Sequence, residues 1–171
     1  MRIVRLIEQD WPMLRRERLR ALEDSPSAFW SELADEADQD EAAWRRFARA
    51  AAWFVALDGH HVLGLVAGLE RAESPGEPEL ISLWVEPGAR RRGVASCLLA
   101  AVSDWAATSG ARELVLWVTQ SNAAARQLYL AHGFAPTGET APLPRDPTVL
   151  EHRLRARISA GPPALFHVPR P

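Results

Sequence analysis

The sequence predicts one domain of the mixed α/β class, built around a single sheet. The chain of 171 residues is long enough to bury a core without disulfides or metals. Hydrophobic residues make up 47% and charged residues 25%, which are ordinary proportions for a globular protein. The expected elements follow the order β, helices, β-β-β, α, β, α, β-β, without an internal repeat or a linker to a second domain.

The N-terminal part is expected to contain one short strand and several helices. Asp10 stands where an N-cap precedes a helix, and Pro12 is tolerated in the first turn of that helix. A later segment places Trp44, Phe47 and Ala48 on one helical face. The expected elements are a strand over residues 2–7, helices over about 11–22 and 40–51, and an irregular helical stretch over about 25–37.

The rest of the chain alternates strands with helices. Asp58-Gly59 is suited to a tight turn and predicts a hairpin. Gly110 and Gly133 each follow an apolar helical segment and are expected to close it. The expected elements are a hairpin over 53–70, a loop over 71–78, strands over 79–87 and 114–118, helices over 94–109 and 123–132, and strands over 134–140 and 148–156 joined by a proline-rich loop over 141–147.

Composition argues against several classes of function. The formal net charge of −2 gives no reason to expect nucleic acid as a partner. No apolar run reaches the ~18 residues of a membrane span, and the N-terminus lacks the apolar segment of a signal peptide. The single cysteine, Cys97, excludes an internal disulfide, and its place on an apolar helix face predicts that it lies in the core. We therefore expect a cytoplasmic protein that binds neither nucleic acid nor membranes.

A basic loop lies between the strand over 79–87 and the helix over 94–109. A helix start offers unpaired backbone N–H groups and a partial positive charge, and both favour an anion such as phosphate. Gly93 allows a close approach of the backbone, and Arg90, Arg91 and Arg92 add positive charge. The loop has neither the GK[ST] of a P-loop nor a dinucleotide GxGxxG. Taken alone, the arginines favour a solvated charge run, but their position together with Gly93 favours an anion site.

The motif Arg90-x-x-Gly93-x-Ala95 resembles the (Q/R)-x-x-G-x-(G/A) signature of the GNAT superfamily of acetyl-CoA-dependent N-acetyltransferases. The preceding strand LISLWV and the later Asn122 and Tyr129, followed by Gly-Phe, match the same family in order and spacing, so the resemblance spans about residues 79–134. It implies a mostly antiparallel, twisted sheet flanked by helices, with a V-shaped gap between the two central strands. On this basis residues 1–159 form the GNAT domain, and residues 160–171 form an extended C-terminal arm.

The resemblance further implies that acetyl-CoA is the co-substrate and that no metal takes part. The pantetheine arm would pair with the backbone of the strand before the loop, like an added strand. The pyrophosphate would rest on backbone amides of the loop and helix start, and an amide side chain would bind the pantetheine arm. The implied cofactor-binding residues are Leu83, Trp84, Val85, Arg90, Arg91, Arg92, Gly93, Val94, Ala95, Ser96 and Asn122.

The family's chemistry is direct attack of an amine on the thioester, without a covalent enzyme intermediate. Glu79 matches a position where many members carry the general base, although a polar residue at a strand edge is an equal alternative. Glu70 is a weaker candidate. Tyr129, the only tyrosine, matches the general acid that protonates the leaving thiolate. Its alternative role is packing in the core.

The acceptor is expected to be a small-molecule amine. Residues 23–41 contain eight acidic residues and no basic one, which indicates either a solvated acidic face or a surface that attracts a cationic amine. Members that acetylate ribosomal-protein N-termini tend to carry a glutamate where this chain has Trp117. Trp30, Trp84 and Trp117 are candidates to reach the acceptor cleft. Two alternatives stay open: acetylation of a protein N-terminus, and a non-catalytic CoA-binding sensor or assembly module. A homodimer also stays open.

Overall fold

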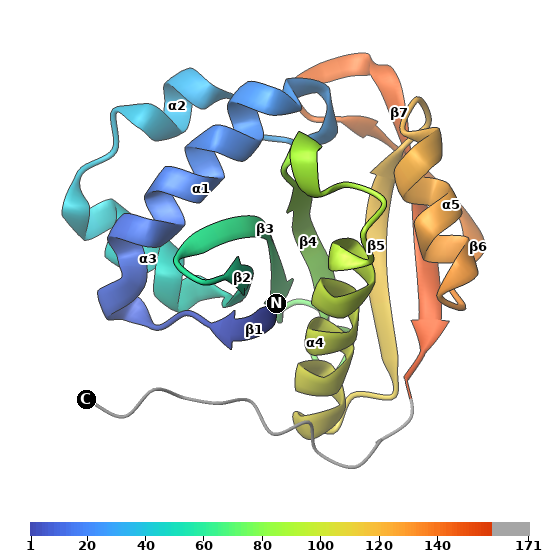
Figure 1. Ribbon diagram of the computed structural model, residues 1–171. Coiled ribbons are helices and arrows are strands. Elements are labelled where there is room, and N and C mark those ends of the chain that lie inside the picture. Colours follow the sequence, from blue (N-terminus) through green and yellow to red (C-terminus); the bar gives the residue numbers. More distant parts are fainter. Residues whose placement is uncertain (159–171) are drawn as a thin grey trace.

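The computed structural model describes residues 1–158 as one seven-stranded sheet with helices on both faces (Figure 1). The strands lie in the order β1-β2-β3-β4-β5-β7-β6. Every neighbouring pair is antiparallel except β4 and β5, which are parallel. The strands are β1 (Arg2–Arg5), β2 (Ala52–Asp58), β3 (His61–Leu69), β4 (Glu79–Val85), β5 (Glu113–Thr119), β6 (Ala135–Leu143) and β7 (Asp146–Arg157).

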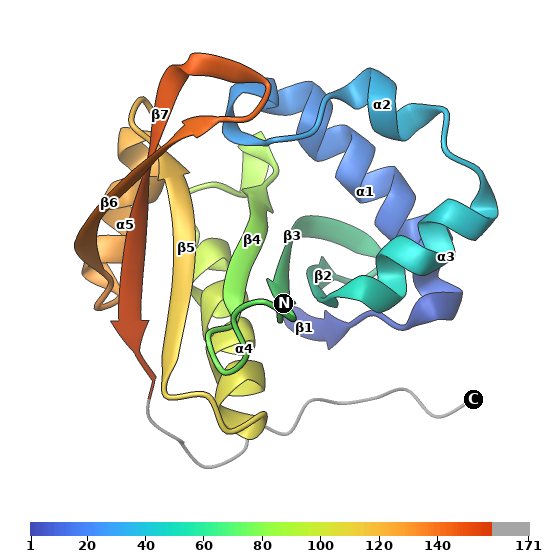
Figure 2. The ribbon, with the colours of Figure 1, turned by 180° about the vertical axis from the view of Figure 1, so that it is seen from behind.

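The helices form the two outer layers. Helices α4 and α5 cover one face of the sheet, and α1 and α3 lie on the opposite face of its β1–β4 half (Figures 1 and 2). The α-helices are α1 (Trp11–Asp24), α2 (Leu33–Ala37), α3 (Glu41–Ala50), α4 (Val94–Thr108) and α5 (Ala123–Ala131). Short 3₁₀ turns are η1 (Glu8–Asp10), η2 (Pro26–Ala28) and η3 (Pro87–Ala89).

The alternation of side chains along β2 explains why the protein has two apolar cores. Successive side chains of a strand point to opposite faces of the sheet. Trp53 and Val55 are buried in the core beneath α1 and α3, whereas Phe54 and Ala56 are buried in the core beneath α4 and α5. The continuous apolar run of this strand is therefore buried on both sides.

The parallel strands β4 and β5 diverge. They pair only where Glu79 lies opposite Val115, and beyond this point the edge of β4 that faces β5 has no strand partner among the described residues. Ser82 in β4 has a positive φ of 59°, and the pairing of β3 with β4 shifts register between Leu65 and Ala67. An irregularity of this kind bends a strand, and here it accompanies the opening between β4 and β5 (Figure 2).

The expected elements were found in the expected order, with two local corrections. The proline-rich loop over 141–147 is mostly strand, because β6 extends to Leu143 and β7 begins at Asp146. Pro142 is tolerated because β6 is an edge strand, where one side of the backbone needs no donor. Asp10 precedes α1 as predicted, but its carboxylate accepts a hydrogen bond from the Ile7 N–H (2.9 Å) and not from the first turn of α1.

Cys97 corrects a third prediction, because its side chain is exposed and not in the core. The buried stripe of α4 runs through Val94, Leu98 and Val102, and Cys97 lies just beside it. Among residues 1–158, no helix is both long and apolar enough to cross a membrane. The predicted C-terminal arm, residues 160–171, lies outside the described residues.

Candidate functional site

The helix start after β4 is open and uncapped. Gly93 is the N-cap of α4, with a φ of +80° and no side-chain cap. A Cβ atom at this position would have no neighbour within 4 Å, so the space beside the glycine is free. The first N–H groups of a helix have no intrahelical acceptor, and the helix dipole adds partial positive charge. These features suit the anion site expected from the sequence.

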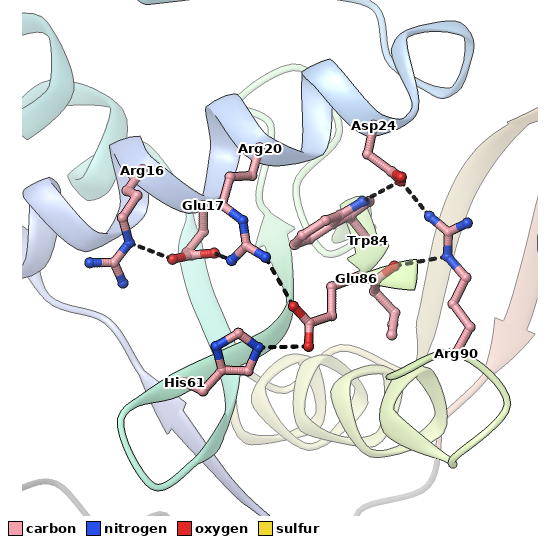
Figure 3. Close-up of polar contacts among 9 residues, drawn as sticks. Arg16, Glu17, Arg20, Asp24, His61, Trp84, Glu86 and Arg90 are labelled. Atoms are coloured by element: carbon pink, nitrogen blue, oxygen red, sulfur yellow. Dashed lines mark hydrogen bonds and ion pairs between the residues drawn. The ribbon is translucent and has the colours of Figure 1, made fainter. Parts of the chain in front are cut away.

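The three arginines of this loop have different surroundings. Arg90 donates from Nε to the Val85 carbonyl oxygen (3.0 Å), and its Nη2 bonds the carboxylate of Asp24 at the end of α1 (Figure 3). Arg91 and Arg92 are exposed and have no ion pair within residues 1–158. The Arg90 side chain therefore fastens the loop to α1, and only the other two guanidinium groups are free to meet an anion.

Asp24 joins the acceptor-side helix α1 to the end of β4. Its carboxylate also accepts a hydrogen bond from Trp84 Nε1 (2.9 Å). Burial acts to raise the pKa of Asp24, but hydrogen bonds from Ser25 and Trp84 and the charge of Arg90 outweigh it and lower this pKa. The carboxylate therefore stays charged at neutral pH and holds both partners.

A second polar chain runs beside the first (Figure 3). The buried Glu17 of α1 binds Arg16 Nε (2.6 Å) and Arg20, and Arg20 reaches Glu86 after β4 (2.9 Å). His61 bonds the other oxygen of Glu86 (2.7 Å). Burial acts to raise the pKa of Glu86, but His61 and Arg20 lower it overall. These contacts attach α1 to the C-terminal end of β4, next to the open edge.

The opening between β4 and β5 contains a cavity of about 220 Å³. Tyr129 belongs to the core beneath α4 and α5, and Phe29 to the core beneath α1 and α3, yet both line this cavity. The cavity therefore reaches from one face of the sheet to the other through the opening. A concave space of this kind, lined by apolar side chains and a few polar groups, is typical of a small-molecule site.

Tyr129 packs in the core and also lines the cavity, so its position is compatible with both of its predicted roles. Its ring is buried and packs against Phe134 with centroids 5.7 Å apart. Its hydroxyl forms no hydrogen bond with any residue among 1–158, although it lines the cavity. Burial raises the pKa of the phenol, so it stays protonated well beyond neutral pH.

Asn122 is the N-cap of α5, where its Oδ1 accepts a hydrogen bond from the Ala125 N–H (3.1 Å). The side chain also lines the cavity. Because the carbonyl oxygen is used by the helix, the NH₂ group is the part of the amide that remains to bind a ligand.

Glu79 lines the cavity at the point where β4 and β5 still pair. It is buried, and its Oε2 accepts a hydrogen bond from Arg71 Nε (2.6 Å). Glu70, the weaker candidate base, is exposed and does not line this cavity. Of the two carboxylates, only Glu79 is placed to act on a bound ligand.

The acidic stretch 23–41 contributes uncharged residues to the cavity wall, Phe29 and Trp30 among them, but none of its eight carboxylates lines the cavity. Glu36 is instead buried in an ion pair with Arg18 (2.8 Å). Trp30 and Trp117 line the cavity as expected, whereas Trp84 does not. With no carboxylate at the cavity, this stretch could attract a cationic amine only from a distance, and that attraction stays a prediction.

Glu151 is the site residue that the sequence did not reveal. It lies on β7 opposite Thr119 of β5, is 3% exposed, and accepts a hydrogen bond from Trp30 Nε1 (2.7 Å). Burial raises the pKa of Glu151, and the charge of Glu79 raises it further, against the lowering effect of the Trp30 bond. The available signal was a charged residue inside the predicted strand 148–156, but its position beside β5 follows only from the sheet order.

Comparison with solved structures supports the fold. The yncA protein of Salmonella typhimurium, solved with its cofactor acetyl-CoA, is 19% identical with a TM-score of 0.74, over 93% of this chain and 94% of that chain. The ribosomal-protein-S18-alanine N-acetyltransferase of Escherichia coli is 23% identical with a TM-score of 0.64, over 96% and 98%. A GNAT-family acetyltransferase of Streptococcus pneumoniae is 20% identical with a TM-score of 0.72, over 91% and 98%. A search of curated proteins gave no match.

Structural similarity at this low identity shows the fold, whereas a match to a family model assigns the chain to a family. The model of the acetyltransferase (GNAT) family matches residues 15–134, well over half of the chain. The matched segment includes the uncapped start of α4, the open edge of β4 and the helix that carries Tyr129. The chain belongs to the GNAT family of acetyltransferases.

Proposed function

We propose that this protein transfers the acetyl group of acetyl-CoA directly to a primary amine of a small molecule. The observation that carries the proposal is the convergence on one cavity of an unpaired strand edge, a buried phenol without a hydrogen-bond partner among the described residues, and a buried carboxylate. The uncapped helix start follows β4 directly in the chain. Together these features supply the donor site and the proton-transfer groups of the reaction.

On the donor side, the backbone does most of the binding. The open edge of β4 offers the backbone groups of Leu83 and the N–H of Val85 to the amides of pantetheine, because the Val85 carbonyl oxygen already accepts from Arg90 Nε. The amides from Arg91 to Ser96 offer N–H groups to the pyrophosphate. Arg91 and Arg92 add charge, and the NH₂ of Asn122 donates to the pantetheine arm. Arg90 contributes by holding the loop in place.

On the acceptor side, the amine must lose a proton before it attacks. A lysine-like amine with a pKa of ~10.4 costs about 4.6 kcal/mol to deprotonate at neutral pH, and an α-amine with a pKa of ~7.7 costs about 1 kcal/mol. Glu79 accepts this proton, directly or through a water. The amine nitrogen then forms a bond to the thioester carbonyl carbon, and the C–S bond breaks.

The departing thiolate takes the proton of the Tyr129 hydroxyl. For an ordinary tyrosine this transfer to a thiolate of pKa ~8.5 costs about 2 kcal/mol, and burial makes it more costly here. The transfer therefore accompanies C–S cleavage. The second proton of the amine nitrogen, released as the amide forms, restores the phenol. The products are the N-acetylated amine and CoA.

A thioester-cleavage assay with a panel of acceptors tests the proposal. Acetyl-CoA is offered with small primary amines and with short peptides that carry a free N-terminus, and thiol release is followed. We expect turnover with small amines. Turnover restricted to peptides would replace the small-molecule acceptor with a protein N-terminus. Binding of acetyl-CoA without turnover on any amine would support a CoA-binding sensor instead.

A further inference from the structure

Two buried carboxylates face the same cavity, and each has one free oxygen. Oε2 of Glu79 is bonded by Arg71, and Oε2 of Glu151 is bonded by Trp30. The Oε1 atoms of both residues have no hydrogen-bond partner within residues 1–158. Both residues are buried, with exposures of 5% for Glu79 and 3% for Glu151. The unpartnered hydroxyl of Tyr129 lines the same space.

The charges around the cavity do not balance. Arg18 is paired with Glu36, and Arg71 is paired with Glu79. Glu151 faces the cavity without a cationic partner among the described residues, since its bond comes from the neutral indole of Trp30. A buried charge is costly unless it is paired, so this arrangement favours a ligand that brings one positive charge.

The position of Glu151 is fixed from both ends of the chain. Arg145, in the turn between β6 and β7, donates to the carbonyl oxygens of Phe29 (2.8 Å) and Pro26 (2.8 Å). These bonds hold the segment that carries Trp30 against the strand that carries Glu151. The Arg71 guanidinium lies over the Trp30 ring, 5.9 Å from its centroid, and helps to hold the indole. The carboxylate is thus oriented before any ligand arrives.

We propose that Glu151 is the acceptor-binding carboxylate of this enzyme, and that the acceptor is a primary ammonium ion with an apolar body. The ammonium group donates to the free oxygens of Glu151 and Glu79, and the apolar body lies against the aromatic walls formed by Phe29, Phe47 and Trp117. This inference rests on the proposed function, because it names the amine that the proposed reaction consumes.

A purely structural role for Glu151 is the alternative, and glutamine separates the two. In Glu151→Gln, the amide oxygen can still accept the Trp30 hydrogen bond, so folding is preserved. The negative charge is lost, so the variant no longer attracts an ammonium ion. Glu32→Gln is the matched control, because Glu32 is exposed, belongs to the acidic stretch and does not line the cavity.

The first experiment measures binding without turnover. Calorimetry at neutral pH compares phenethylamine, which is cationic, with the neutral 2-phenylethanol, both on the chain alone and on the chain saturated with CoA. We expect the wild type and Glu32→Gln to favour the amine by roughly ten- to hundredfold, the range expected of a charged hydrogen bond. Glu151→Gln should lose most of this preference with an unchanged melting temperature.

A second readout needs no variant of Glu151. In the wild type, the preference for phenethylamine should fade as pH falls through the raised pKa of Glu151, while the amine itself stays protonated. The other charged or titratable groups lining the cavity are Arg18, Arg71, Glu79 and Tyr129. Of these, Glu79 is the only other carboxylate. In Glu79→Gln the pH-dependent preference should therefore persist and shift to lower pH, because the neighbouring negative charge that raises the pKa of Glu151 is gone.

Two outcomes overturn the inference: equal binding of amine and alcohol by the wild type, or an unchanged preference in Glu151→Gln. Its failure differs from failure of the proposed function. If acetyl-CoA is turned over on amines but Glu151→Gln leaves the acceptor KM unchanged, only the inference fails. If phenethylamine binds through Glu151 but no acetyl transfer occurs, only the proposed function fails. If the inference and the proposed function both hold, Glu151→Gln should raise the acceptor KM more than it lowers kcat. Glu79→Gln should lower kcat more than it raises KM.

Discussion

The two sides of the cavity are built in different ways. The donor side comes from one continuous stretch, residues 79–134, and its groups are largely backbone: a strand edge and a helix start. The acceptor side is assembled from side chains far apart in sequence; Trp30 and Glu151, for example, are separated by 121 residues. A backbone site needs only the correct local conformation, whereas a side-chain site depends on which residues the fold brings together. The two sides therefore depend on different kinds of sequence information, one local and one distributed along the chain.

The two sides are nevertheless connected through α1. Asp24 of α1 binds both Trp84 of β4 and Arg90 of the anion loop. Arg18 of the same helix bonds Ser82 Oγ at the irregularity of β4 (3.1 Å) and pairs with Glu36. The contacts of Asp24 therefore reach the donor side, and the contact of Arg18 with Ser82 reaches the opening between β4 and β5. Variants in each region test how far the comparison holds.

The largest expected effect is on the backbone side, in Gly93→Asp. The substitution puts a negative side chain at the open start of α4 and forces a non-glycine residue to a φ of +80°. We expect binding of CoA, measured by calorimetry, to fall below detection. Gly110→Asp is the matched control, because Gly110 has a φ of +85° at the other end of the same helix and equally free surroundings.

Both variants should lose a similar stability of about 1–2 kcal/mol from backbone strain. Only Gly93→Asp should lose CoA. Equal CoA affinity in the two variants would move the pyrophosphate site away from the start of α4.

The second effect tests the side chain that the donor side contributes to chemistry. Tyr129→Phe removes a hydroxyl that has no hydrogen bond with the described residues, so the free energy of unfolding should not fall. Turnover should fall by about 10²–10⁴-fold, the usual contribution of a general acid, with CoA affinity retained. A thiol-release assay measures turnover, and calorimetry measures CoA affinity.

The pH profile of the wild type supplies a check on the same residue. Burial raises the pKa of Tyr129, and a general acid must be protonated to act. Turnover therefore should not decline as pH rises from neutral through ~10, the ordinary pKa of tyrosine. A decline centred near that value, present in the wild type and absent from Tyr129→Phe, would show a solvent-accessible phenol and contradict the buried one described here.

The third effect separates steering from structure on the acceptor side. Glu36→Gln leaves the buried Arg18 without its ionic partner, and such a loss costs about 3 kcal/mol or more of folding free energy. Denaturant unfolding should show this loss, whereas Asp35→Asn, an exposed neighbour, should show none. A rise in the acceptor KM of Glu36→Gln at unchanged stability, reduced by salt, would instead support the prediction that the acidic stretch attracts the amine.

The smallest effect tests the connection between the two sides. Asp24→Asn keeps an oxygen for Trp84 but loses the ion pair with Arg90, at a cost of about 0.5–1 kcal/mol, since the pair is partly exposed. The folded pKa of Asp24 is lowered, so its contribution is fully present above about pH 4 and fades as pH falls through the folded pKa. The stability difference from the wild type should shrink over that range.

A double-mutant cycle with Arg90→Gln sharpens this test. If Asp24 and Arg90 act as one unit, the double variant should lose no more stability, and no more CoA affinity, than either single variant. Additive losses would mean that the two residues act independently and that α1 is not coupled to the anion loop through them.

The sequence alone predicted the order of the elements, which the structure confirms, and it singled out the residues proposed for the donor side. The loop from Arg90 to Ala95 could be interpreted because a glycine at a helix start and its neighbouring charges are local features, a few residues apart. Asn122 and Tyr129 were singled out because each is the only residue of its type in the chain and because their order and spacing match the family. Cys97 and residues 141–147 were misjudged at the margins of elements, where a stripe of buried side chains ends or an edge strand accepts prolines.

Only the tertiary structure decided what the acceptor side is made of. The side chain of Arg90, expected to meet an anion, bonds Asp24 because α1 lies beside the loop. Glu36 is buried in an ion pair with Arg18 and is not exposed to solvent. Glu151 lines the same cavity as Glu79 because β7 lies next to β5 in the sheet. These contacts join segments that are distant in the chain, and no local pattern encodes them. Short stretches of sequence determine the local backbone geometry, whereas the partners of buried charges depend on how the whole chain packs.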